Sequence, residues 1–176
     1  MLYLIIGGSK AGKSRYAEQL AVTQRAERML YFATMVPVGD GEAGTACIER
    51  HRAQRRGLGF ETIEKAVYLR EIPLQPSDVV LLEDVPNLIG NYQFGEKKAD
   101  ALAEALQDIR EIAGRCKALI AVTYAEMPME PSFDEETKGY VEKINEMARL
   151  LAEEADSVVM LEQGKSKTLK VKVPLQ

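Results

Sequence analysis

The chain has 176 residues, of which 46% are hydrophobic and 28% charged, proportions that are ordinary for a globular protein. This length is enough for one domain with a sizeable core, so we expect residues 1–176 to form a single domain. The net charge of −4 and the pI near 5.2 argue against a general nucleic-acid binder, which is usually basic.

The two cysteines, Cys47 and Cys116, match no metal-ligand spacing and are too few for a disulfide framework. A reducing, cytoplasmic location is the simplest interpretation. The first apolar run, Met1 to Ile6, is too short for a signal peptide or a membrane span, and no later run reaches the required length. We therefore expect a soluble cytoplasmic protein without a membrane span.

The first elements in chain order predict a βαβ unit. Leu2 to Ile6 is a continuous apolar run ended by glycines, which is typical of a buried strand. Lys13 to about Gln24 has apolar residues at the spacing of one helical face, and Met29 to Ala33 is a second buried strand. Strand, loop, helix and strand in this order indicate a largely parallel sheet.

The rest of the chain continues the alternation of strands and helices. A loop is predicted at 36–44, helices at 45–56, 99–116 and 135–154, and strands at 60–64, 79–82, 118–123 and 158–161. Residues 168–173 alternate lysines with apolar residues, which predicts an antiparallel edge strand with one wet face. The whole pattern predicts a three-layer α/β fold with a mostly parallel sheet.

A phosphate-binding loop of the form GxxxxGK[ST] lies between the first strand and the first helix. The glycines let backbone N–H groups surround phosphate oxygens, and the start of the helix adds partial positive charge. A lysine at this position contacts the β- and γ-phosphates, and the serine after it is a ligand of Mg²⁺. The alternative, a turn that merely joins strand to helix, does not explain the full match. The matching residues are Gly7, Gly8, Ser9, Lys10, Ala11, Gly12, Lys13 and Ser14.

Two acidic residues, Glu83 and Asp84, follow the buried run at 79–82 directly. Ligands of parallel sheets gather at the carboxyl ends of the strands, so Glu83 is placed for a metal or catalytic role. A carboxylate that caps or solvates the strand end is the alternative. Asn87 and Asn91 follow at helical spacing and are either substrate contacts or turn residues.

The single histidine, His51, lies in the arginine-rich stretch Glu49 to Arg56. Arginines in such a cluster would hold a polyphosphate, and a neutral imidazole among them could attack an α-phosphorus. A solvated basic face is the alternative, and the residues alone do not decide between the two.

Several short segments share one order along the chain. The loop is followed by Arg-x-Ala-Glu, a strand ending in Tyr-Phe-Ala-Thr, the histidine among arginines, a Thr-x-Glu strand, the acidic strand with a later asparagine, and an Ala-Asp-Ser-Val strand entry. This series resembles the bifunctional adenosylcobinamide kinase / adenosylcobinamide-phosphate guanylyltransferase family of cobalamin biosynthesis. The chain departs from the family pattern at Lys10 and Ala11 and at residues 124–131 and 145–149.

The resemblance implies a RecA-like fold and two reactions. In the first, a nucleoside triphosphate phosphorylates the hydroxyl of the aminopropanol arm of adenosylcobinamide. In the second, GTP guanylylates a histidine, and the GMP passes to adenosylcobinamide phosphate to give adenosylcobinamide-GDP. Family members can assemble as homotrimers.

The same resemblance implies roles for residues of this chain. Catalysis falls to His51, Lys13 and Glu83, and nucleotide binding to the phosphate loop together with Arg52, Arg55 and Glu64. Ser14 and Glu83 would hold Mg²⁺, the expected cofactor, with ATP or GTP and a corrinoid as substrates.

Two other functions are compatible with the sequence. One is a P-loop kinase of another small hydroxyl substrate, in which His51 is purely structural. The other is a regulatory protein that binds nucleotide but has lost catalysis, which the altered segment at 124–131 favours. The histidine within its arginine cluster favours the bifunctional enzyme over the first, and Lys13, Ser14 and Glu83 favour either enzyme over the second.

Overall fold

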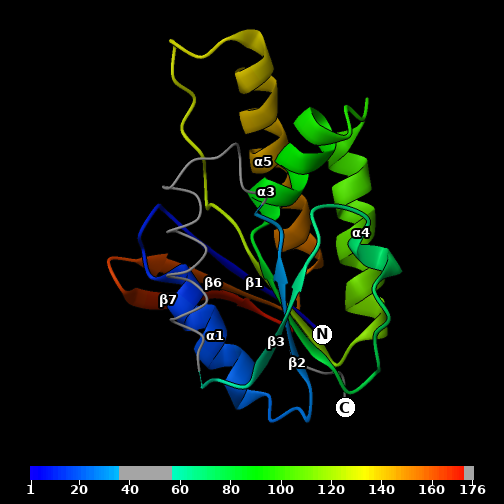
Figure 1. The fold of residues 1–176 in the computed structure, drawn as a ribbon. Coiled ribbons are helices and arrows are strands. Elements are labelled where there is room, and N and C mark those ends of the chain that lie inside the picture. Colours follow the sequence, from blue (N-terminus) through cyan, green and yellow to red (C-terminus); the bar gives the residue numbers. More distant parts are fainter. Residues whose placement is uncertain (36–56, 173–176) are drawn as a thin grey trace.

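The computed structural model describes residues 1–35 and 57–172, which form a seven-stranded sheet between helices (Figure 1). The loop predicted at 36–44 and the helix predicted at 45–56 lie outside the described residues. The strands are β1 (Leu2–Gly7), β2 (Met29–Ala33), β3 (Phe60–Glu64), β4 (Val79–Glu83), β5 (Ala118–Val122), β6 (Ser157–Glu162) and β7 (Lys165–Val171). The helices are α1 (Lys13–Thr23), α3 (Val85–Gly90), α4 (Ala101–Arg115) and α5 (Glu135–Glu154), with short helical turns η1 (Leu69–Glu71) and η2 (Asn91–Gly95).

The sheet order is β3-β2-β4-β5-β1-β6-β7, and all neighbouring strands are parallel except the antiparallel pair β6 and β7. The mostly parallel sheet with an antiparallel strand at its end was predicted from the sequence and is confirmed. It follows from the alternation of apolar strands and helices, because a parallel neighbour requires a crossover helix whereas the last strand needs only a tight turn.

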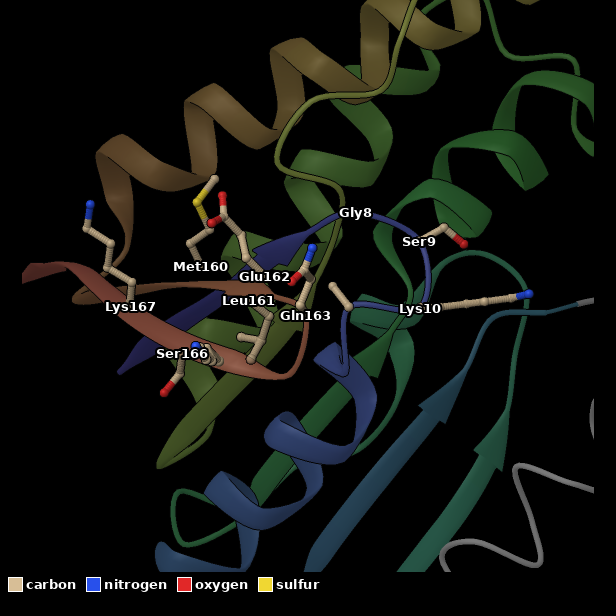
Figure 2. Close-up of a pocket in the computed structure, with 11 residues that line it drawn as sticks. Gly8, Ser9, Lys10, Met160, Leu161, Glu162, Gln163, Ser166 and Lys167 are labelled. Atoms are coloured by element: carbon tan, nitrogen blue, oxygen red, sulfur yellow. The ribbon is translucent and has the colours of Figure 1, made fainter.

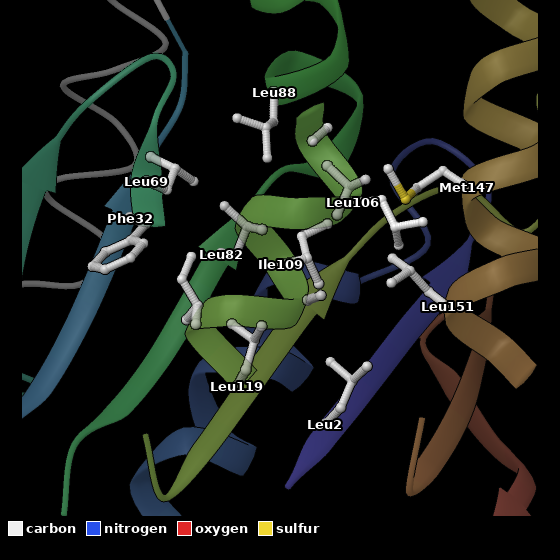
Figure 3. Packing of buried hydrophobic residues seen from close by; sticks show 14 of the residues in the cluster. Leu2, Phe32, Leu69, Leu82, Leu88, Leu106, Ile109, Leu119, Met147 and Leu151 are labelled. Atoms are coloured by element: carbon white, nitrogen blue, oxygen red, sulfur yellow. The ribbon is translucent and has the colours of Figure 1, made fainter. Parts of the chain in front are cut away.

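Both faces of the sheet are covered, which is why its central strands are apolar along their whole length. On one face α1 packs through Ala17 and Ala21 on a cluster that includes Ile5 and Leu81. On the other face, residues of α3, α4 and α5 pack on the alternate strand positions in the larger cluster (Figure 3). Two-sided burial removes the alternation of polar and apolar residues that a half-exposed strand would show.

Two features differ from the prediction. Strand β4 runs directly into α3, which was not predicted; Asp84 caps this helix by accepting a hydrogen bond from the backbone N–H of Asn87 at 2.9 Å. Strand β7 was predicted to have one wet face, but it is exposed on both, and Leu169 and Val171 are 48% and 62% exposed. No described element packs over those two apolar side chains, because α1 lies further toward the centre of the sheet.

A buried carboxylate on α4 holds the turn η1 and the helical turn η2 together. Asp108 is fully buried and accepts hydrogen bonds from the backbone N–H groups of Leu69 and Arg70 and from the Tyr92 hydroxyl. The Arg70 guanidinium donates to the same carboxylate at 3.0 Å, so the charge is paired. The Tyr92 hydroxyl in turn accepts the backbone N–H of Tyr68.

We expect Asp108→Ala to lower the free energy of unfolding by about 3 kcal/mol, because it leaves the partly buried Arg70 guanidinium with Glu104 alone and the Leu69 N–H and the Tyr92 hydroxyl without their acceptor. Urea unfolding followed by circular dichroism measures this change. Glu111→Ala, an exposed residue on the same helix, is the matched control and should change the free energy of unfolding by less than about 0.5 kcal/mol. Equal effects of the two variants would contradict the assignment.

Candidate functional site

The phosphate loop leaves the carboxyl end of β1 and enters α1 through two special glycines. Gly12, directly before the helix, has φ of 95°, a left-handed conformation that favours glycine. A Cβ on Gly7 would clash with the backbone carbonyl oxygen of Leu161 in β6. The backbone N–H of Gly164, in the β6–β7 turn, donates to the carbonyl of Ala11 at 3.2 Å. The loop is therefore fitted closely against the β6–β7 hairpin.

The ammonium group of Lys13 lies across the loop that precedes it. It donates to the backbone carbonyls of Gly7 and Gly8 at 3.2 and 2.7 Å, and it lies 4.8 Å from the centre of the Tyr124 ring. Burial lowers the pKa of Lys13, and the nearby Asp84 and Glu83 carboxylates oppose that change. This cation is half-buried and close to the backbone that would surround a phosphate.

Glu83 at the end of β4 meets Ser14 at the start of α1. The Ser14 hydroxyl donates to one oxygen of the Glu83 carboxylate, and the Tyr31 hydroxyl donates to the other at 3.0 Å. A hydroxyl and a carboxylate are hard oxygen ligands that suit Mg²⁺. The described ranges contain no group of three acidic, cysteine or histidine residues that could hold a metal. A magnesium ion here would take its remaining ligands from phosphate and water, as is usual at nucleotide sites.

Asp84 is less accessible to solvent than an ordinary surface carboxylate, and it lies near the charges of Glu83 and Lys13. Burial raises its pKa to about 6, the charge of Glu83 adds to this effect, and the hydrogen bond from the backbone of Asn87 and the charge of Lys13 oppose it. The Thr34 hydroxyl donates to the backbone carbonyl of Asp84 at 3.0 Å.

Two tyrosines line the side of the site next to α5. Tyr124 lies beside Lys13, and Tyr140 donates its hydroxyl to the Pro86 carbonyl at 2.8 Å. Burial raises the pKa of Tyr140 to about 12, with Asp84 adding to the effect. The Tyr140 phenol is therefore a neutral donor at physiological pH beside the acidic strand end.

The remaining predicted residues are placed as follows. Glu64 is exposed at the end of β3 and lies opposite Ala33, which on its other side lies opposite Glu83. Glu64 is thus on the same edge of the sheet as Glu83, one strand removed. Gly8, Ser9 and Lys10 are exposed and Ala11 is buried. His51, Arg52 and Arg55 lie outside the described residues.

Asn91 has a structural role that its sequence position left open. Its amide donates to the backbone carbonyls of Thr34 and Ala66, at 2.7 and 2.9 Å, and so joins the ends of β2 and β3 to the helical turn after α3. Sequence reasoning missed the contacts of Tyr31 and Tyr124. Tyr31 could have been suspected, because a phenol in a buried strand requires a hydrogen-bond partner.

The raised pKa of Asp84 has a consequence for stability. The folded protein takes up the proton of this carboxyl near pH 6, whereas an ordinary aspartate has a pKa of 3.8. Above about pH 6 the buried charge therefore lowers stability, and below about pH 4 this penalty disappears.

We expect Asp84→Asn, which keeps a capping oxygen for α3, to remove the penalty. The difference in unfolding free energy between variant and native chain should be about 1–3 kcal/mol more favourable to the variant at pH 7.5 than at pH 4. Urea unfolding at the two pH values measures it, and using the difference cancels the titration of other groups. An identical difference at both values would show that Asp84 has an ordinary pKa.

None of the described helices combines the length and apolar character needed to cross a bilayer. Two solved structures show weak similarity to the chain. Flagellar accessory protein FlaH from Methanocaldococcus jannaschii is 14% identical, with a TM-score of 0.46, and the match covers 99% of this chain and 81% of FlaH. P4 protein from bacteriophage phi6 is 12% identical, with a TM-score of 0.45, and the match covers 94% of this chain and 53% of P4.

Sequence relatives are closer. The bifunctional adenosylcobalamin biosynthesis protein CobU of Escherichia coli is 33% identical over 144 residues, and that of Salmonella typhimurium is 31% identical over 144 residues. Each match covers 73% of this chain and 77% of the relative. The model of the family described as cobinamide kinase / cobinamide phosphate guanyltransferase matches residues 3–169. The chain therefore belongs to the cobinamide kinase / cobinamide phosphate guanyltransferase family.

Proposed function

We propose that this chain is an adenosylcobinamide kinase and adenosylcobinamide-phosphate guanylyltransferase. The observation that carries the proposal is the meeting of Lys13, Ser14 and Glu83 at the carboxyl edge of the sheet in a member of this family. A phosphate loop alone would suit many activities. A carboxylate at the end of β4 that contacts the loop serine adds the second half of a triphosphate site.

In the kinase reaction, the loop binds the triphosphate and Lys13 neutralises charge that develops between the β- and γ-phosphates. The substrate hydroxyl attacks the γ-phosphorus and loses its proton, while the bond from that phosphorus to the β-phosphate oxygen breaks. Ser14 and Glu83 would hold Mg²⁺, which when bound supplies positive charge to the phosphate oxygens.

In the transferase reaction, the neutral imidazole of His51 attacks the α-phosphorus of GTP and pyrophosphate leaves. A phosphate oxygen of adenosylcobinamide phosphate then attacks the phosphorus of the guanylyl group, and the bond from that phosphorus to the imidazole nitrogen breaks, which regenerates the histidine. Arg52 and Arg55 hold the polyphosphate, since guanidinium groups bind phosphate oxygens in pairs. The homotrimer that the family resemblance implies is part of the same proposal.

Removing the loop cation tests the kinase step. We expect Lys13→Ala to lower nucleoside triphosphate turnover at least 100-fold, because among the described residues no other cation contacts the loop carbonyls. Steady-state release of nucleoside diphosphate in the presence of adenosylcobinamide measures the effect. Lys138→Ala, a surface lysine paired with Glu135 on α5, is the control and should leave turnover unchanged. Unchanged turnover in Lys13→Ala would remove the phosphate loop from the mechanism.

A labelling experiment tests the transferase step. Incubation with Mg²⁺ and GTP labelled at the α-phosphate should place acid-labile label on the native chain and none on His51→Ala, because His51 is the only histidine of the chain and the proposed nucleophile. Label that persists in the variant would identify another nucleophile. An unlabelled native chain that still consumes nucleoside triphosphate with adenosylcobinamide would leave a kinase alone.

A further inference from the structure

A cleft lies between the phosphate loop and the β6–β7 hairpin (Figure 2). Its volume is about 630 Å³, within the range of sites that bind small organic ligands. One wall is the backbone of Gly8 to Ala11, and the other is formed by residues of β6, the turn and β7. The mechanism above uses the loop but none of the hairpin side chains.

The strand order determines which part of a bound nucleotide lies toward this cleft. Glu83 ends β4, which is separated from β1 by β5 on one side, whereas β6 and β7 lie on the other side of β1. The metal and the terminal phosphates belong beside Ser14 and Glu83. The nucleoside end of the same nucleotide therefore extends from the loop in the direction away from β4. The hairpin is the part of the described sheet on that side.

The walls of the cleft combine an apolar floor with polar groups at the rim. Met160 is half-buried and offers an apolar surface for a flat ring, whereas Leu161 is buried on the opposite face of β6. Glu162 and Gln163 are exposed at the rim and supply a carboxylate and an amide for hydrogen bonds. Figure 2 shows Gln163 at the hairpin tip next to the loop, whereas the Lys10 side chain points away from the hairpin.

We propose that this cleft binds the nucleoside of the nucleotide whose phosphates occupy the loop, with the base on Met160 and its polar edge at Glu162 and Gln163. The inference rests on the proposed function, because it assumes that the loop binds phosphates. It adds a subsite for the base and ribose, and it makes the hairpin a determinant of nucleotide affinity.

The geometry of the hairpin makes this subsite preformed. The turn residues Gln163 and Gly164 have φ of 48° and 78°, as in a tight two-residue turn, and the Gly164 N–H binds the loop at Ala11. Gly7, at the start of the phosphate loop, also packs closely against the Leu161 carbonyl in β6. Phosphate loop and cleft are thus held in one arrangement before a ligand arrives, which reduces the entropic cost of binding.

Inorganic tripolyphosphate separates the two parts of the site, because it carries the phosphates without a nucleoside. Calorimetry with Mg²⁺ compares it with the α,β-methylene analogues of ATP and GTP, which a nucleophile cannot cleave at the α-phosphorus. We expect the native chain to bind at least one analogue about tenfold or more tighter than tripolyphosphate.

The double variant Glu162→Ala/Gln163→Gly removes the rim groups, and glycine suits the positive φ of the turn. It should bind tripolyphosphate within about twofold of the native value but lose about tenfold in affinity for the analogues. Gln107→Ala/Glu111→Ala removes one amide and one carboxylate from the exposed surface of α4 and should alter neither affinity.

Several results would overturn the inference. Equal affinity of the native chain for tripolyphosphate and both analogues, or an unaltered preference in the hairpin variant, would show that the nucleoside binds elsewhere while the loop still binds phosphates. Loss of tripolyphosphate binding in the hairpin variant would show that the hairpin acts by supporting the phosphate loop at Ala11 and not as a separate nucleoside subsite. If the native chain bound none of these ligands, the proposed function would fail and this inference with it.

Discussion

The Glu83 carboxylate joins segments that are far apart in the chain, since it accepts hydrogen bonds from Ser14 in α1 and from Tyr31 in β2. Parallel pairing makes this contact possible, because it brings the carboxyl ends of β1, β2 and β4 to one edge of the sheet. The loop, the acidic strand end and the start of α3 all meet there. The contact between Ser14 and Glu83 at this edge holds the start of α1, and with it the end of the phosphate loop.

The charges at this edge are held in an environment that favours their neutral forms. Burial lowers the pKa of Lys13 and raises that of Asp84, and each charge partly compensates the other. A folded chain gains nothing in stability from such an arrangement, and perturbed groups of this kind concentrate at functional sites. A polyphosphate beside Lys13 would supply the negative charge that its half-buried ammonium lacks.

The antiparallel end of the sheet contributes to the site in a different way. The β6–β7 hairpin needs no crossover helix, so its turn can lie directly against the phosphate loop. This close packing leaves room for glycine alone at position 7, where any side chain would meet the Leu161 carbonyl. The hairpin therefore supports the loop and forms one wall of the cleft, while its outer strand keeps Leu169 and Val171 exposed.

The sequence by itself determined the strands, the long helices of the described ranges and the phosphate loop, because these depend on local patterns: apolar runs, helical periodicity, and glycines before Lys13 and Ser14. It also placed Glu83 at a strand end, but not which residues contact it. Only the tertiary structure decided that Tyr31 and Ser14 share its carboxylate, that Asn91 is structural, and that the hairpin packs on the loop. These contacts follow from strand order and register, which are set by packing between residues distant in the chain, and a single sequence carries no local pattern for them.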